Sequence, residues 1–209
     1  MNPRDAAYAQ LFPPKAGRGE KTKLRIVRAA IACLAKEGVE NLTFESVGKR
    51  IGINRTQVKY HFKEKDDLVD KTIEYVIATA QLVVVERLSK AKQWKAQINA
   101  IVDGFFDWVE NNPDQGSVLF LLYYSATFHP RRREFHSKMT EMGFNRTFAV
   151  LQSAQKEMGW NQSQVKSLSL SVWALIDGFM LYHLSTNPKK DQQYFRKQAL
   201  KVAALLFRN

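Results

Sequence analysis

The chain has 209 residues, 45% of them hydrophobic and 25% charged, which is typical of a globular protein and excludes a disordered one. The net charge of +12 is unevenly spread: residues 1–65 hold fourteen Lys and Arg against six Asp and Glu, and the remainder hold eighteen against fourteen. This basic N-terminal third favours nucleic-acid binding. A membrane surface is the competing interpretation, but no basic amphipathic helix stands apart from the folded pattern.

The N-terminal residues have no apolar core of a secretory signal, and the longest apolar run, 118–124, is too short to span a bilayer. The single cysteine, Cys33, excludes an intrachain disulfide. Its apolar helical context indicates a core residue rather than a redox sensor. We therefore expect a cytoplasmic protein with no membrane association.

Apolar residues recur at helical spacing along most of the chain, and no segment alternates long enough for a strand, so we predict an all-α fold of about nine helices. Residues 1–19 are rich in proline and glycine and are expected to form a flexible arm, either solvated or touching DNA. The first helix is predicted over 20–37, where Gly38 ends it.

Two short helices joined by a tight turn follow. Thr43 is expected to cap the first, and Gly52, which enters the left-handed conformation cheaply, to end it. Asn54 is expected to cap the second, and Gln57 can complete a capping box. The outward face of this second helix holds cations, an amide and a phenol but no carboxylate. The pattern indicates either a helix-turn-helix that enters a DNA major groove or an ordinary helical hairpin.

A long helix is predicted from residue 64 or 65 to 89, at about 37 Å long enough to link two domains. Further helices are predicted over 94–110, 115–127, 131–158, 162–185 and 192–207, bounded by proline, glycine and asparagine signals. We divide the chain into an arm (1–19), a three-helix DNA-binding domain (20–65) and a ligand-binding and dimerisation domain (66–209).

Residues 20–70 resemble the TetR family of transcriptional regulators. The resemblance rests on Gly38 after the first helix, Thr43 opening the second, the turn at 52–54, the aromatic-rich segment at 60–62, and Lys65 with Leu68. Beyond these residues only the layout and length match. The resemblance implies that a set of residues contacts DNA: Thr43, Arg55, Thr56, Gln57, Lys59, Tyr60, His61 and Lys65.

Some of these roles have alternatives. Gln57 either reads a base or is occupied by its capping box, and His61 is either a phosphate contact or a hinge residue. Lys59 stands where the family often has a tyrosine, so the contact there differs, although a lysine binds phosphate readily. Thr43 and Lys65 are expected to hold phosphates, whereas Phe62 and Leu68 are expected to be core.

Fifteen of the twenty-four aromatic residues lie between Trp94 and Tyr182. In similar regulators the corresponding helices enclose an effector cavity, which implies a largely apolar pocket for a hydrophobic or aromatic molecule. The candidate lining residues, some of which are expected to be plain core, are Phe105, Trp108, Tyr123, Tyr124, Phe128, Phe148, Trp173, Asp177 and His183.

The leading hypothesis is a ligand-responsive regulator, a repressor released from a near-palindromic operator, acting as a homodimer through its last two helices. Both of those helices have broad apolar stripes, although a monomer core would also use them. The alternatives are an architectural DNA-binding protein without an effector and, less favoured, a helical enzyme. The four histidines form no metal-ligand pattern and no phosphate-cradling loop is present, so we expect no cofactor, metal or catalytic residue.

Overall fold

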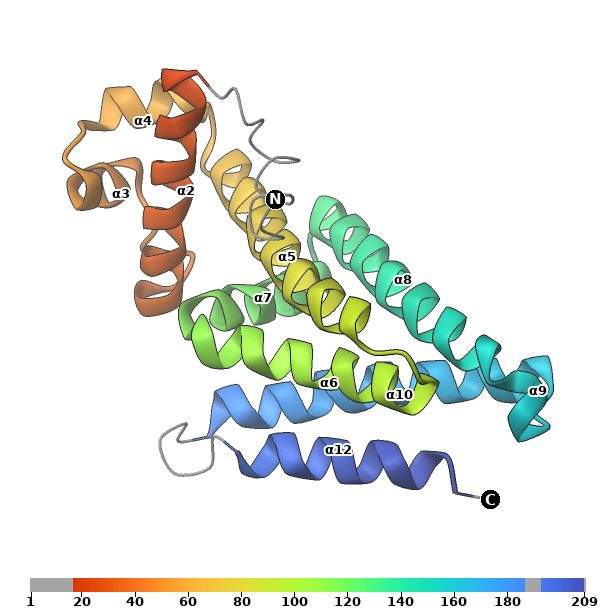
Figure 1. Ribbon diagram of the computed structural model, residues 1–209. Helices are drawn as coiled ribbons and strands as arrows, with labels where there is room; N and C mark the ends of the chain where they lie inside the picture. The colour runs from red at the N-terminus through yellow and green to blue at the C-terminus, as the bar shows by residue number, and fades with distance from the viewer. Residues whose placement is uncertain (1–16, 187–192, 209) are drawn as a thin grey trace. The chain divides into compact units, whose positions relative to one another are not determined.

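The computed structural model describes residues 17–186 and 193–208, which form ten α-helices and no strand (Figure 1). The all-α prediction is confirmed. The predicted arm lies outside the described residues as far as residue 16, including Arg4 and Lys15. The helices in chain order are α2 (Arg18–Glu37), α3 (Phe44–Ile51), α4 (Arg55–His61), α5 (Lys65–Lys90), α6 (Trp94–Asn111), α7 (Pro113–Ala126), α8 (Pro130–Ser153), α9 (Gln155–Met158), α10 (Gln162–Ser185) and α12 (Tyr194–Leu206).

Helix ends differ from the predicted ranges by one or two residues, and one predicted helix is broken in two. The predicted helix 131–158 is divided into α8 and α9 at Ala154. The amide of Ala154 donates to Leu151 O at 3.1 Å and the Ser153 hydroxyl donates to Val150 O at 2.7 Å. These shorter-range bonds tighten the last turn of α8 and interrupt its ladder. Gly159, in the left-handed conformation with φ 68°, then ends α9.

The helices form two compact units. The N-terminal unit comprises Met1–Leu82 and Asn112–Arg133, and the C-terminal unit comprises Val83–Asn111 and Glu134–Asn209. Helix α5 therefore contributes its first two thirds to one unit and its end to the other. These units are defined by compactness alone. The predicted boundary at residue 65 between a DNA-binding and a ligand-binding domain stays a prediction.

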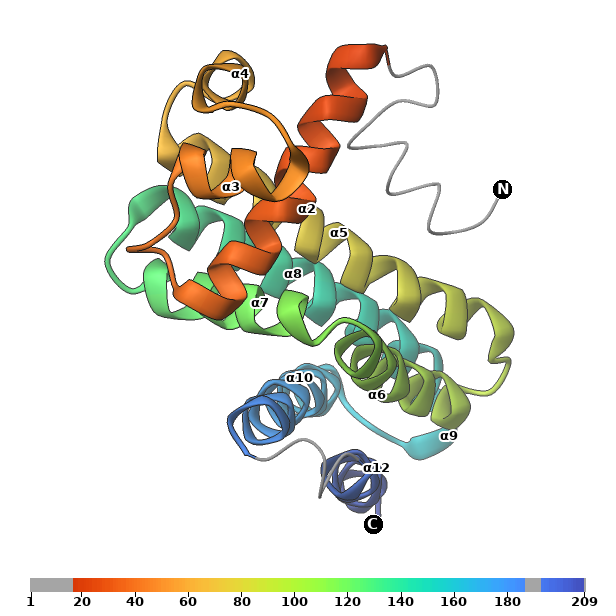
Figure 2. The same cartoon turned by 90° about the vertical axis from the view of Figure 1, so that its left-hand side faces the viewer.

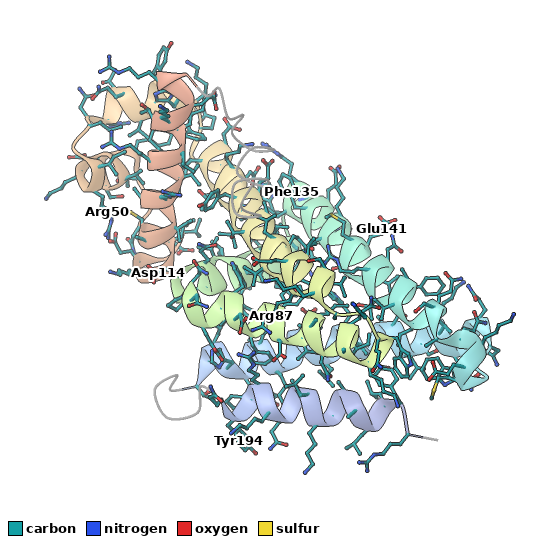
Figure 3. All side chains as sticks on the ribbon, viewed as in Figure 1. Arg50, Arg87, Asp114, Phe135, Glu141 and Tyr194 are labelled. Carbon is teal, nitrogen blue, oxygen red and sulfur yellow. The ribbon has the colours of Figure 1, made fainter. Side chains whose placement is uncertain are left out.

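In the N-terminal unit, α2 packs against α3, α4 and α7. Its buried face carries aliphatic side chains, including Ile26, Val27 and Ile31. Polar bonds also fix α3 on α2: Arg50 of α3 reaches Glu37 at 2.6 Å and the buried Cys33 Sγ at 3.0 Å, and Arg25 of α2 donates to Ile51 O at 2.8 Å (Figure 3). Residues distant in the sequence thereby hold α3 against α2.

In the C-terminal unit, α6, α10 and α12 lie side by side and are seen nearly end on in Figure 2. Arg196 of α12 bonds Asp103 at 2.7 Å and Asp107 at 2.8 Å on α6. At the other end, the rings of Trp94, Trp160 and Phe207 pack together with centroids 5.3–5.9 Å apart. These contacts fix α12 along its length.

Candidate DNA-binding surface and effector site

Both short helices begin with a capping box. In α3 the Ser46 amide donates to Thr43 Oγ1 at 3.0 Å while the Thr43 amide donates to Ser46 Oγ at 3.1 Å. In α4 the Gln57 amide donates to Asn54 Oδ1 at 2.9 Å and the Asn54 amide donates to Gln57 Oε1 at 3.0 Å. These reciprocal bonds satisfy amides that a short helix otherwise leaves without partners.

The turn between α3 and α4 depends on two glycines. Gly52 adopts the left-handed conformation, with φ 72° and ψ 32°, as its position in the sequence predicts. Gly48, inside α3, was not anticipated. A Cβ on Gly48 would lie 2.6 Å from the Ile53 carbonyl oxygen, which is too close for two nonbonded atoms, so the turn would have to shift. Gly48 therefore allows the turn to fold back closely over α3.

A surface groove runs from the start of α3 to the start of α5. Of the predicted DNA-contacting residues it brings together Thr43, Arg55, Lys59 and Lys65. It also includes Lys63, a cation in the link between α4 and α5 that the sequence analysis did not single out. Three glutamates, Glu40, Glu45 and Glu64, line the same groove and partly balance the charge of its cations. The Lys65 ammonium donates to the Glu40 carbonyl at 3.2 Å.

The outward face of α4 presents Thr56, Gln57 and Tyr60 to solvent. Tyr60 is 76% exposed, and the Lys63 ammonium lies 5.9 Å from the centre of its ring. Because the Gln57 carbonyl oxygen is occupied by the cap, its NH₂ group is the part left to face a base. The two roles considered for Gln57 are therefore compatible in this geometry.

His61, at the end of α4, is half-buried and packs edge-on against Tyr60 at 5.2 Å between ring centroids. Burial, assisted by the nearby Lys23 ammonium, lowers the pKa of His61 below its usual value. A neutral imidazole still has one N–H donor, so the phosphate contact and the hinge role of His61 both stay predictions.

The predicted effector residues fall in both units, and each unit is described by itself. In the C-terminal unit Phe105, Trp108, Trp173 and His183 are buried, and Phe148 and Asp177 are half-buried. The rings of Phe105 and Trp173 meet edge-to-face at 5.4 Å. His183 meets Phe106 at 5.8 Å, and burial lowers the pKa of its imidazole.

In the N-terminal unit Tyr123 is half-buried, and Tyr124 and Phe128 are exposed and pack on each other at 5.2 Å. Tyr124 and Phe128 thus form a surface pair within their unit. Whether any of the nine residues lines an effector pocket stays a prediction. The structure adds one residue that the sequence analysis missed, Arg146 of α8, a half-buried cation on the same helix as Phe148.

Among the described residues, no group of three or more His, Cys, Asp or Glu side chains is placed to hold a metal ion. One helix, α10, has the length and apolar composition of a membrane span. A single such helix is weak evidence, because the interface helix of a water-soluble assembly passes the same test. Only a third of its apolar window is buried within the protein.

Residues 26–72 match the family model of the bacterial regulatory proteins of the tetR family. The chain is 24% identical over 170 residues to the HTH-type transcriptional regulator BetI of Vibrio campbellii, covering 80% of this chain and 83% of that protein. Among solved structures, a transcriptional regulator from Saccharomonospora viridis in complex with choline aligns with a TM-score of 0.79 at 17% identity, covering 88% of this chain and 96% of the other. The SmeT–triclosan complex aligns with a TM-score of 0.69 at 18% identity, covering 88% of this chain and 90% of the other.

The capped helix pair, its cationic groove and these similarities define a helix-turn-helix DNA-binding protein. Residues 26–72 carry the N-terminal domain of the TetR family of transcriptional regulators, and 80% of the chain aligns with a regulator at 24% identity. Its relatives are regulators and not enzymes.

Proposed function

We propose that this regulator is a cytoplasmic homodimer that binds a near-palindromic operator and is released from it, as a repressor is, by a small molecule. The observation that carries the DNA-binding part is the groove in which Thr43, Arg55, Lys59 and Lys65 meet beside the exposed face of α4. The threonine and the two lysines would hold phosphates, whereas Arg55, Thr56 and Gln57 would approach base edges.

The dimer would form through α10 and α12. On α10, Leu170, Ala174, Gly178 and Leu181 recur at helical spacing; Leu170 is 59% and Leu181 51% exposed. Nothing in the described residues lies within 4 Å of a Cβ placed on Gly178. Small residues between two exposed leucines permit close approach of a second helix. Tyr194 at the start of α12 is also exposed (Figure 3). A dimer would cover this surface and account for the apolar composition of α10 without a membrane.

Two structural neighbours were solved with small molecules, choline and triclosan, which supports a small-molecule effector for this chain as well. Helix α5 starts directly after the DNA-reading helices and ends in the unit that carries the buried aromatic residues. A ligand that binds more tightly to one position of α5 would change the distance between the α4 helices of the two subunits. That distance would then depart from the roughly 34–36 Å of a major-groove repeat.

The test begins by selecting bound fragments from genomic DNA with the purified chain, then measuring affinity for the selected site by fluorescence anisotropy. Lys65→Ala should weaken binding to all sequences alike and lower the slope of log K against log salt by about one unit, because one phosphate contact is lost. Lys95→Ala, an exposed lysine on α6, is the control and should leave the slope unchanged. An unchanged slope in Lys65→Ala would contradict the groove assignment.

Release by a metabolite panel tests the regulatory part. A protein that binds DNA and responds to no compound would be an architectural protein, and the effector proposal would then be wrong.

A further inference from the structure

Arg146 of α8 is a cation without a carboxylate. Four arginines of the described residues are not exposed: Arg87, Arg132, Arg146 and Arg196. Arg87 bonds Asp107, Arg132 bonds Asp66 and Asp70, and Arg196 bonds Asp103 and Asp107. Of these four arginines, Arg146 is the one that forms no ion pair with an acidic side chain among the described residues. Its Nη1 atom is fully buried and has no hydrogen-bond partner.

This arrangement is costly for the protein by itself. The buried Nη1 of this half-buried guanidinium loses hydration without a compensating bond. Burial is the only effect on the pKa of Arg146, and it lowers that pKa. Glu141, the carboxylate nearest to it along α8, is exposed and lies on the outer side of the helix (Figure 3). The chain therefore supplies no counter-ion from this helix.

The surroundings of Arg146 are aromatic. The six-membered ring of Trp173, from α10, lies directly on Gly143, so closely that a Cβ there would overlap it. Gly143 precedes Arg146 by three residues, so the two positions are neighbours on the surface of α8, about one turn apart. Long side chains on a helix lean back toward the preceding turn, which here contains Gly143. The Arg146 side chain and the Trp173 indole consequently approach the same stretch of α8.

The same stretch leaves other polar atoms unsatisfied. Trp173 is buried and its indole Nε1 has no hydrogen-bond partner, and the Thr140 hydroxyl, one turn before Gly143, has none either. Buried donors without partners are uncommon in proteins and call for a ligand or an explanation. The hydroxyl and the guanidinium thus stand within one turn on either side of Gly143, on which the Trp173 indole lies, and the Phe105 ring meets Trp173 at 5.4 Å; all three groups can donate to an anion.

We propose that the effector of this regulator is an organic acid whose carboxylate binds Arg146 and whose apolar or aromatic body packs against Trp173 and Phe105. The inference rests on the proposed function, because it identifies the chemical class of that effector. It narrows the sequence-based expectation of a hydrophobic or aromatic molecule to an anionic one. A cationic ligand is excluded from this position, since Arg146 would repel it.

Binding is tested on the full chain by isothermal titration calorimetry with matched probes that share one apolar body: 3-phenylpropanoate, 3-phenylpropanamide and 3-phenylpropan-1-amine, together with octanoate and octanamide. The acids should bind about 10- to 100-fold more tightly than their amides, since hydrogen bonds to a charged group are the stronger ones. Arg146→Gln should remove that difference, and Arg208→Gln, which deletes an exposed arginine of the same unit, should preserve it. Equal affinity of acids and amides, acids that bind Arg146→Gln as well as wild type, or no acid binding at millimolar concentration would each overturn the proposal.

A second measurement needs no ligand. Arg146→Met retains much of the side-chain volume and removes the buried charge, so the melting temperature without ligand should rise, by about 2–4 °C. A fall would show that Arg146 has a structural partner instead. The outcome is separable from that of the proposed function: if a neutral or cationic compound releases the operator, the regulator stands and the anionic effector is wrong, whereas release by no compound defeats the proposed regulation itself.

Discussion

Gln57 has a structural role in its capping box and a predicted recognition role in the same side chain. Its carbonyl oxygen closes the capping box with the Asn54 amide at 3.0 Å, and its NH₂ group remains on the exposed face of α4. A substitution that retains one of these groups and removes the other can separate the two roles.

Gln57→Glu keeps an oxygen for the Asn54 amide and places a negative charge in the first turn of α4, which favours the helix dipole. Its unfolding free energy should therefore match that of wild type, while operator binding weakens because the donor is lost and a carboxylate faces the DNA. Gln57→Ala should lose about 1 kcal/mol of stability with the cap. Chemical denaturation and fluorescence anisotropy measure the two quantities. If Gln57→Glu bound the operator as tightly as wild type, the amide would not be at the interface.

At the scale of elements, α5 and the start of α8 are joined by buried charges within the N-terminal unit. Arg132, 5% exposed, lies 2.6 Å from Asp66 and 3.3 Å from Asp70, which is itself 2% exposed. Asp70 also pairs with the exposed Arg131 at 3.0 Å. These pairs fix the opening turns of α5, which directly follow the reading helices.

Arg132→Ala should cost up to about 3–5 kcal/mol, because it leaves the buried Asp70 carboxylate with the exposed Arg131 as its remaining ion pair. Arg131→Ala is the matched control and should cost at most about 1 kcal/mol, since its guanidinium is exposed and its ion pairs are screened by solvent. Urea denaturation of the three proteins gives the difference. Similar losses in both variants would show that the buried pair contributes no more than a surface one.

The sequence predicted most helices because periodic apolar residues and end signals lie close together along the chain. The range 162–185 agrees with α10, and the caps at Thr43 and Asn54 are confirmed. No proline or glycine stands at Ala154, so no end signal in the sequence marks the break between α8 and α9. The roles of Gly48, Lys63 and Arg146 depend on segments that meet only after folding, or on the absence of a partner, and neither is visible in local patterns.

At the scale of the whole molecule, we expect the exposed stripe on α10 to determine whether the regulator assembles. Leu181→Glu places a charge in this stripe without disturbing the protomer core, since Leu181 is half exposed. The variant should be a folded monomer that has lost most operator affinity, as one short recognition helix reads few bases. Sedimentation measures the mass and circular dichroism the fold. Lys166→Glu, on an exposed position of the same helix, is the comparison. A wild-type protein that sediments as a monomer at micromolar concentration would refute the dimer.

If Gln57 contacts a base, as we predict, its capping bond bears on the operator sequence. With one lone pair of its oxygen held by the Asn54 amide, the side chain has its NH₂ group as the freer end for a base. The two-point pairing of glutamine with adenine also needs the oxygen at the base, so it would compete with the capping bond. Guanine, whose N7 and O6 are adjacent acceptors, matches a lone NH₂ group, whereas the N6 amino group of adenine would oppose it. In a two-fold complex the same guanine should recur at mirrored positions of the two half-sites.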